Sequence, residues 1–205
     1  MMYVSHYLLT LRDCRALRLT DGYSLHRAVY GLFPDVRRGA EGRSGFLYAD
    51  KGGKNGVRRI LVLSDRSPDA PEHGRIESRP LPESFLDFQD YRFEVIINPV
   101  RRNRETGRRE AVRGREAVER WFLSKAPSWG FAPRPETVQV ADITVDEFCK
   151  NGMKVTLGKA RITGALAVAD KTLFTRSFTH GLGHGKAFGC GLLQLAPLAF
   201  SFDGA

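Results

Sequence analysis

The sequence contains few cysteines, and its histidines are scattered. Its 205 residues include three cysteines, which are far apart and form no C-x-x-C pair: Cys14, Cys149 and Cys190. This argues against a disulfide framework and against a zinc ribbon. His180 and His184 lie four residues apart, but the glycines between and beside them argue against a helix that would align the two side chains. We therefore expect neither a metal site nor a cofactor.

Long apolar runs are also missing. No segment approaches the roughly 18 consecutive apolar residues of a membrane-spanning helix. The first residues, MMYVSHYLLTLRDCR, lack the apolar core and the small-residue cleavage site of a signal peptide. These features predict a soluble, cytoplasmic protein that makes no contact with a membrane.

Lysine is scarce relative to arginine. The chain contains 24 Arg and 8 Lys, and its net charge is +9. Because Arg makes forked contacts with phosphate and stacks on bases, this bias hints at a polyanionic partner. A GC-rich genome would raise the Arg content without any such function, so composition alone leaves both interpretations open. An apolar share of 42% with 10% aromatic residues is enough for a core and excludes disorder over most of the chain.

The first half of the chain reads as β-α-β-β-(loop or short helix)-β. Thr20 or Asp21 is placed to cap a helix, and Pro34 disfavours helical geometry at the residue before it. The turn-rich motif KGGKNG separates two short apolar runs, which is typical of a β-hairpin. We expect strands over 2–11, 45–50, 57–64 and 75–81, and a helix over 22–33.

The second half repeats this order without repeating the sequence. A turn at 150–152 joins two long β-rich runs, and Asp170 is placed to cap a helix. Two β-α-β-β-α-β units in tandem predict an α+β fold of two ferredoxin-like, RRM-like domains, which we place at 1–88 and 89–205. In the second unit we expect strands over 91–98, 137–148, 153–168 and 192–198, and helices over 116–125 and 171–180.

The expected helix over 22–33 has an unusual polar face. Four apolar residues fall on the side of the helical wheel that would face a sheet: Leu25, Ala28, Val29 and Leu32. Four others fall on the opposite side: Tyr23, His26, Arg27 and Tyr30. A solvated face normally carries Lys, Glu and Gln, whereas two Tyr, a His and an Arg suit proton transfer, base stacking and phosphate contact. The alternative is a histidine that only packs on a loop or has no role.

A glycine-rich stretch follows His180. Five glycines within eleven residues, Gly183 and Gly185 among them, would let backbone N–H groups approach a phosphate closely, and Lys186 adds a point charge. No Ser or Thr follows Lys186, and the stretch precedes a strand instead of opening a helix. It is therefore neither a Walker A loop nor a dinucleotide-binding fingerprint. The alternative is a turn that needs glycine only for tight packing.

Seven arginines and no lysine lie within 101–115, between an expected strand and an expected helix. We expect a mobile loop that becomes ordered on an RNA backbone through Arg101, Arg102, Arg104, Arg108, Arg109 and Arg113. An ordinary solvated charge run is the alternative. Four further residues extend this basic surface over the tip and second strand of the expected hairpin, although a hairpin without a partner would look the same: Lys150, Lys154, Lys159 and Arg161.

Taken together, these motifs resemble the CRISPR repeat-RNA endoribonuclease of the type I-E Cascade system, the CasE family. The resemblance is carried by the N-terminal strand, by the motif YSLH at 23–26 running on to GLFPD, and by the tail GLGHGKAFGCGLLQLAPL. It covers the whole chain in order and length. It implies two ferredoxin-like domains, metal-independent cleavage of the repeat in the precursor transcript, and a product hairpin retained by a Cascade subunit.

The resemblance assigns roles to a few positions. Tyr23 and His26 match the catalytic positions, and the glycine-rich stretch with Lys186 looks like the RNA-contacting loop. The helix carries no lysine near His26, so Arg27 or Lys186 is left to supply a positive charge. The middle of the chain, with its arginine run, is the variable part of the family, and its assignment to RNA rests on charge alone.

The chemistry implied needs no metal, because RNA carries its own nucleophile. We expect the 2′-oxygen to attack the adjacent phosphorus 3′ of the stem-loop, leaving a 2′,3′-cyclic phosphate and a 5′-hydroxyl. His26 would act as general acid or as general base, and Tyr23 would bind the phosphate or position the 2′-hydroxyl. We expect a monomer when free, and slow turnover because the product hairpin stays bound.

Two other functions remain open at this point. The chain would also suit a non-catalytic RNA-hairpin-binding module, although the aromatic strand signature of an RRM, K/R-G-F-G-F, is missing. A scaffold subunit of a ribonucleoprotein could use the basic surface for assembly only. The repeat sequence and the scissile position are not encoded in any motif of the chain.

Overall fold

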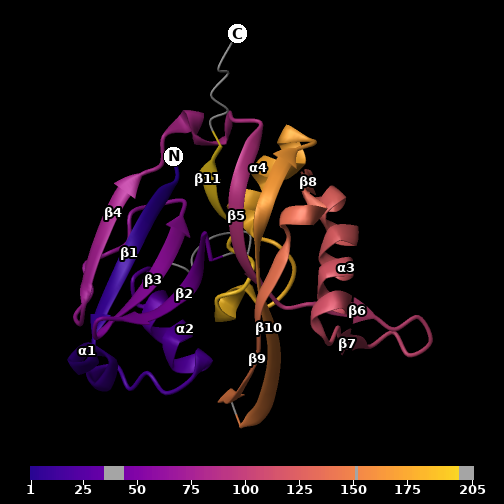
Figure 1. Ribbon diagram of the computed structural model, residues 1–205. Helices are drawn as coiled ribbons and strands as arrows, with labels where there is room; N and C mark the ends of the chain where they lie inside the picture. The colour runs from indigo at the N-terminus through magenta and orange to yellow at the C-terminus, as the bar shows by residue number, and fades with distance from the viewer. Residues whose placement is uncertain (35–43, 151, 199–205) are drawn as a thin grey trace.

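Two antiparallel sheets lie side by side in the computed structural model, which describes residues 1–34, 44–150 and 152–198 (Figure 1). The predictions that fall on 35–43, 151 and 199–205 lie outside the described residues: part of the first expected domain with Asp35 of the GLFPD motif, Asn151 of the expected turn, and the end of the second expected domain. Within the described ranges, no helix is long and apolar enough to cross a lipid bilayer.

The first sheet has the strand order β2-β3-β1-β4, with every neighbouring pair antiparallel. This is the order that a β-α-β-β-α-β unit takes when its first strand lies between its third and fourth. Of the two options predicted between β3 and β4, a loop or a short helix, the structure has the loop. The elements of this unit are β1 (Tyr3–Thr10), α1 (Leu11–Ala16), α2 (Gly22–Tyr30), β2 (Phe46–Lys54), β3 (Val57–Ser64), β4 (Arg75–Pro80) and the 3-10 turn η2 (Glu83–Leu86).

Helix α2 begins as predicted and ends earlier. Asp21 is its N-cap and accepts a hydrogen bond from the Ser24 backbone N–H at 2.7 Å, within a capping box. The helix ends at Tyr30 instead of residue 33, because Gly31 weakens helix formation and the chain tightens there into bonds between residues three apart. The short helix α1 was not predicted, although Thr10 and Asp13 form a capping box at its start.

The second sheet has the order β11-β5-β10-β8, and β9 also pairs with β10. This repeats the order of the first sheet, so the predicted α+β fold of two ferredoxin-like units is confirmed. Asp170 caps α4 as predicted. The elements are β5 (Asp90–Ile97), β6 (Val100–Arg102), β7 (Arg109–Ala111), α3 (Arg115–Lys125), η3 (Ala126–Trp129), β8 (Phe131–Pro133), η4 (Pro135–Thr137), β9 (Gln139–Lys150), β10 (Met153–Val168), α4 (Lys171–His180), η5 (Lys186–Phe188) and β11 (Gln194–Pro197).

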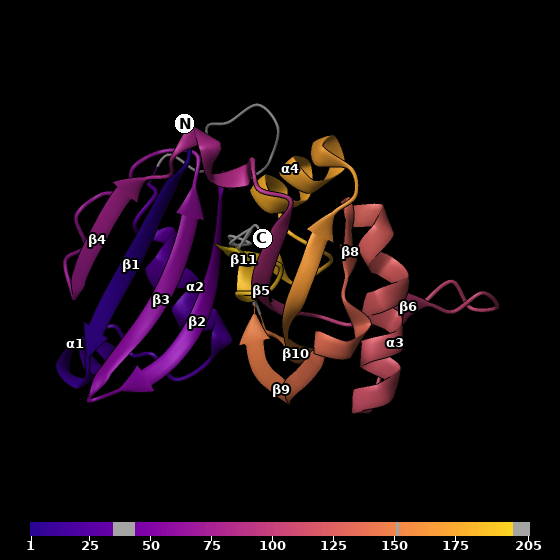
Figure 2. The same ribbon diagram turned by 45° about the horizontal axis from the view of Figure 1, so that its top comes forward.

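The arginine run is a β-hairpin and not the expected loop. Strands β6 and β7 pair with each other and project beyond α3, away from both large sheets (Figures 1 and 2). The Asn103 side chain closes the turn by accepting from the backbone N–H groups of Glu105 and Thr106 at 2.8 and 2.9 Å. At the base, Trp121 of α3 donates to the Val100 carbonyl at 3.1 Å. The prediction of a loop was wrong because it considered only the charges of this segment, whereas the Asn103 side chain stabilises a turn by hydrogen bonds to the backbone.

The two units share an apolar interface. Leu47 and Leu63 of the first sheet pack in one cluster with Ile96, Phe178 and Leu192 of the second unit. Separate cores lie under α2 in the first unit and under α3 and α4 in the second. The interface brings α2 against β9 and η5, and β2 against η5, which creates the junction described below.

Glu94 links the two units by charge. Its carboxylate accepts from Lys51 of β2 at 2.7 Å and from Arg161 of β10 at 2.6 Å. Burial raises the pKa of Glu94, but the hydrogen bonds and charges of these two cations outweigh burial and leave the pKa below its usual range. The stability that this carboxylate contributes is therefore present above its unfolded-state pKa and is lost as the pH falls through the lower folded-state pKa.

Glu94→Gln should lower the free energy of unfolding by about 1–2 kcal/mol at neutral pH, because two cations lose their carboxylate. The effect is smaller than for a fully buried pair, since the Lys51 and Glu94 side chains are 28% and 26% exposed. Chemical denaturation over a pH series that descends from neutral should show the difference shrinking in acid, as the pH falls through the lowered folded-state pKa of the wild-type carboxylate. Glu116→Gln, which removes an exposed pair with Arg120, is the control. An equal loss in both variants would contradict the role of Glu94.

Candidate active site

His26 lies where the two units meet. Its Nδ1 is 2.7 Å from the carbonyl oxygen of Ala187, a residue of η5 that lies 161 positions further along the chain. A carbonyl oxygen can only accept, so Nδ1 carries the hydrogen in this bond. Nε2 is then the one ring nitrogen left for a substrate, and in the neutral ring it carries the lone pair.

Aromatic rings surround this imidazole. The centroid of the His26 ring lies 5.9 Å from that of Tyr23, 4.0 Å from Tyr30 and 5.5 Å from Phe188. Phe148 of β9 completes the wall, with its ring 4.6 Å from Phe188 and 6.5 Å from Tyr23. The predicted polar face of the helix is therefore covered in part by η5 and β9, and the imidazole is half-buried.

Partial burial lowers the pKa of His26. The hydrogen bond to Ala187 opposes this shift, and the positive charge of Lys150 adds to it. The net direction is below the usual value near 6.5, so the neutral imidazole predominates at pH 7. In this form Nε2 can accept a proton.

Glycines let the loop around η5 approach the first sheet. Gly189 has a φ of +80°, and a Cβ there would lie 3.0 Å from the Tyr48 ring, so tight packing requires this glycine. Gly183 also has a positive φ, of +62°, but a Cβ there would meet nothing within 4 Å. Packing therefore accounts for Gly189, whereas only its backbone conformation favours glycine at position 183.

The predicted cations differ in how they are held. Lys186 donates from Nζ to the carbonyl oxygen of His180 at 2.6 Å, which ties it to its own loop. Arg27 is exposed on α2, directly after His26. Lys150 was predicted only as a hairpin-tip residue, but its Nζ lies 5.8 Å from the centre of the Phe188 ring, next to the histidine site. The structure thus adds Lys150 to the cations near His26.

The β6–β7 hairpin presents most of its arginines to solvent. Arg101 lies 3.7 Å from Glu110, and Arg102 donates to the Gly107 carbonyl at 3.1 Å. Within the part of the chain that the structure describes, no hydrogen bond or ion pair engages the guanidinium groups of the other four predicted residues: Arg104, Arg108, Arg109 and Arg113. These four are exposed and available to a polyanion.

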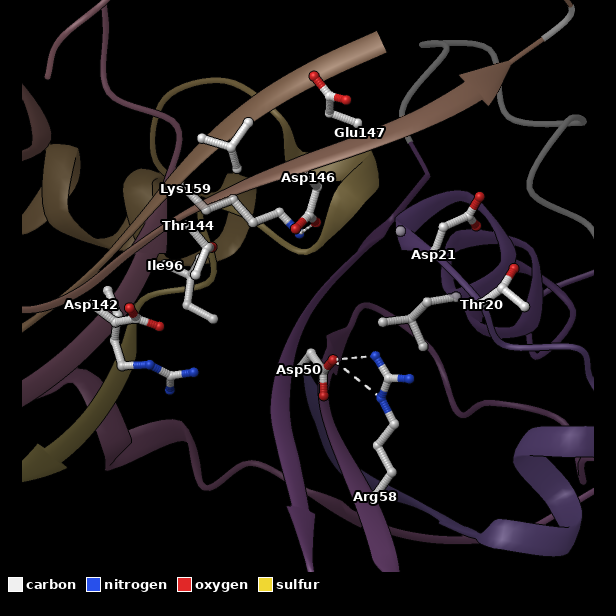
Figure 3. Close-up of a pocket in the computed structure, with 14 residues that line it drawn as sticks. Thr20, Asp21, Asp50, Arg58, Ile96, Asp142, Thr144, Asp146, Glu147 and Lys159 are labelled. Carbon is white, nitrogen blue, oxygen red and sulfur yellow. Dashed lines mark hydrogen bonds and ion pairs between the residues drawn. The ribbon is translucent and has the colours of Figure 1, made fainter. Parts of the chain in front are cut away.

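The basic residues of β10 are paired with carboxylates. Lys154 lies 3.0 Å from Glu147, and Lys159 lies 2.6 Å from Asp146 with only 17% of its side chain exposed. Lys159 and Arg161 line a cavity of about 480 Å³ between the units, and Figure 3 shows Lys159 turned toward Asp146. Five carboxylates line the same cavity, so it is not a uniformly basic surface: Asp21, Asp50, Asp142, Asp146 and Glu147.

Sequence reasoning missed the aromatic residues of the second unit and of β2 that complete the histidine site. Phe148 lies at the end of an expected strand beside two carboxylates, and Phe188 lies within the glycine-rich stretch. Nothing local marks either residue as a neighbour of His26. Tyr48 donates from its hydroxyl to the same Ala187 carbonyl at 2.9 Å, yet its sequence context is that of a core strand. No periodicity or spacing in the chain would have found these three residues.

Known proteins are similar to this chain in both sequence and fold. The chain is 27% identical over 196 residues to the CRISPR-associated endoribonuclease Cse3 of Thermus thermophilus, covering 87% of this chain and 92% of that protein. A structure of Thermus thermophilus Cse3 bound to an RNA representing a pre-cleavage complex superposes with a TM-score of 0.81 at 24% identity, covering 96% of this chain and 99% of that one.

A crystal structure of the CRISPR-associated protein Cas6e from Escherichia coli K-12 gives a TM-score of 0.66 at 19% identity, covering 97% of this chain and 100% of that one. These likenesses agree with the resemblance drawn from the sequence motifs. The family model described as CRISPR associated protein matches residues 2–197, nearly the entire length, and the chain belongs to that family.

Proposed function

We propose that this chain is an endoribonuclease that cleaves CRISPR precursor RNA within the repeat, 3′ of the stem-loop, without a metal ion. It leaves a 2′,3′-cyclic phosphate and a 5′-hydroxyl, and it stays bound to the hairpin of the product beside other subunits of a surveillance complex. Its two domains, 1–88 and 89–205, have different roles. The first carries the catalytic residues Tyr23 and His26, and the second contributes the RNA-binding hairpins and the glycine-rich loop.

One observation carries this proposal: the geometry of His26. Its Nδ1 is engaged by the Ala187 carbonyl, so Nε2 is the ring nitrogen left for a substrate, in a half-buried site flanked by rings that suit base stacking. The name of the Thermus thermophilus relative, an endoribonuclease, supports the proposed cleavage of RNA. A structural neighbour is a CRISPR RNA-guided surveillance complex, which supports the choice of partners.

In the proposed step the RNA supplies the nucleophile. Nε2 of neutral His26 takes the proton of the 2′-hydroxyl, the 2′-oxygen bonds to the adjacent phosphorus, and the bond from phosphorus to the 5′-oxygen breaks. The leaving 5′-oxygen takes a proton from solvent or from the imidazolium so formed. The lowered pKa of His26 favours this role as base at the start of the step. Tyr23 binds the phosphate, and Lys150 or Arg27 offsets the charge that develops on it.

RNA binding is assigned to three surfaces. The β6–β7 hairpin presents exposed arginines to the phosphates of the stem, and the tip of the β9–β10 hairpin adds Lys150 and Lys154. The glycine-rich loop adds Gly183, Gly185 and the ammonium of Lys186. We assign Lys159 and Arg161 a weaker role, because both are paired with carboxylates and their side chains are only 17% and 31% exposed, whereas Lys154 remains 66% exposed beside Glu147.

The direct test is incubation with the cognate repeat RNA in EDTA, followed by analysis of the new ends. We expect one cut, a downstream fragment that polynucleotide kinase labels without phosphatase treatment, and an upstream fragment that resists periodate. Binding without any cut would favour the non-catalytic hairpin-binding module. A 5′-phosphate on the downstream fragment would exclude attack by the 2′-oxygen.

A further inference from the structure

Tyr48 of β2 shares a hydrogen-bond acceptor with His26. Its hydroxyl donates to the Ala187 carbonyl at 2.9 Å, and His26 Nδ1 donates to the same oxygen at 2.7 Å. Tyr48 is only 1% exposed, so no water competes freely for this bond. Both donors belong to the first unit, whereas the acceptor belongs to η5 of the second.

The two donors fill the capacity of this oxygen. A carbonyl oxygen has two lone pairs, and the Ala187 oxygen has two donors within hydrogen-bond distance. With Tyr48 in place the carbonyl is held against His26 and cannot turn toward another donor. The proton of the neutral imidazole then stays on Nδ1, because the hydrogen bond made by one ring nitrogen sets the state of the other.

The ring of Tyr48 reinforces the same contact. Gly189 follows η5 and lies so close to this ring that a Cβ would come within 3.0 Å of it. The loop is thus held on the first unit by a hydroxyl at Ala187 and by ring packing at Gly189. Removing only the hydroxyl leaves the ring contact and so separates orientation of the carbonyl from attachment of the loop.

We propose that Tyr48 is a positioning residue that acts through the Ala187 carbonyl and keeps Nε2 of His26 unprotonated and directed to the RNA. This inference rests on the proposed function of His26 and extends it to a residue that does not touch the substrate. Without the Tyr48 hydroxyl, the Ala187 carbonyl is free to turn, and the tautomer with hydrogen on Nε2 becomes populated. Only the molecules that keep hydrogen on Nδ1 can then accept the proton of the 2′-hydroxyl.

Tyr48→Phe should lower the single-turnover cleavage rate by about 5- to 10-fold, in proportion to the loss of the competent tautomer. Tyr7→Phe is the matched control, because Tyr7 is also 1% exposed in the first sheet and donates from its hydroxyl to one backbone carbonyl, that of His73, at 2.8 Å. Nitrogen-15 chemical shifts of His26 above its pKa report the tautomer directly. They should show hydrogen on Nδ1 in the wild type and in Tyr7→Phe, and a mixture in Tyr48→Phe.

Two results would overturn the inference. Wild-type His26 with its hydrogen on Nε2 would do so even if the Tyr48 variant failed to fold. So would a Tyr48→Phe protein whose rate and tautomer match those of Tyr7→Phe. In the His26→Ala background, Tyr48→Phe should cost no further rate, because it acts only through the imidazole. If His26→Ala itself cleaves at the wild-type rate, the proposed function of His26 fails instead, while the tautomer measurement still tests the contact.

Discussion

His26→Ala should lower the single-turnover cleavage rate by about 10²–10⁴-fold, the contribution typical of a general acid–base group. Affinity for the repeat hairpin should change little, because the exposed arginines of β6 and β7 lie outside the histidine site. The fold should persist as well: Tyr48 still holds the Ala187 carbonyl when the imidazole is gone. The measurement is a single-turnover time course in EDTA with protein in excess, beside a direct binding assay on the same RNA.

Two further variants sharpen this result. His26→Asn keeps an N–H that can donate toward Ala187 but has no group that titrates near neutral pH, so it should be as inactive as the alanine variant. His6→Ala removes an exposed histidine of β1 and should cleave normally. If His26→Asn retained most of the wild-type rate, His26 would be a packing residue and proton transfer would have to be assigned elsewhere.

The sequence predicted helix caps, strands and the buried face of α2, because each depends on residues close together in the chain. Capping depends on residues three positions apart, so the sequence identified Asp170 as an N-cap and limited the N-cap of α2 to Thr20 or Asp21. A short apolar run beside the KGGKNG turn predicted β3, and a long β-rich run after the turn at 150–152 predicted β10; the predicted limits of both strands coincide with those observed. The wheel of α2 separated the buried face, with Leu25 and Val29, from the face that carries His26.

Contacts between distant segments could not be predicted in this way. The carbonyl that fixes the orientation of His26 belongs to the backbone of Ala187, and a backbone acceptor leaves no mark in residue identity. The second example is Lys159, which counts as +1 in any tally of charge. Its partner Asp146 lies on the neighbouring strand, in the register that pairs β9 with β10, and the pair neutralises it. Net charge therefore overstated the basic surface of β10.

The exposed basic surface is concentrated in the β6–β7 hairpin. Three exposed arginines of the β6–β7 hairpin, Arg104, Arg108 and Arg109, have guanidinium groups that are bound to nothing else in the described ranges. Because water already solvates them and no internal partner has to be broken, contact with phosphate releases counterions at little other cost. We therefore expect these residues to dominate the salt dependence of hairpin binding.

Replacing all three with Gln should weaken hairpin binding by about 100-fold at roughly 0.15 M salt, from about 1 kcal/mol for each exposed ionic contact. The slope of log K against log salt should flatten by about 2–3, since each lost phosphate contact removes about 0.7–0.9. The assay uses the His26→Ala background, so that the RNA stays intact during the titration. The fold is not at risk, because Asn103 and Trp121 hold the hairpin through bonds that these substitutions do not touch.

The matched control replaces Arg12, Arg15 and Arg79, which are exposed on α1 and β4 at the opposite side of the molecule (Figure 1). Both triple variants lose the same net charge, so a long-range field effect would weaken RNA binding equally in the two. Local contact predicts a large loss and a flatter slope for the hairpin variant alone. Equal losses with unchanged slopes would mean that the hairpin touches no phosphate, and the stem would then have to lie along the β9–β10 hairpin and the glycine-rich loop.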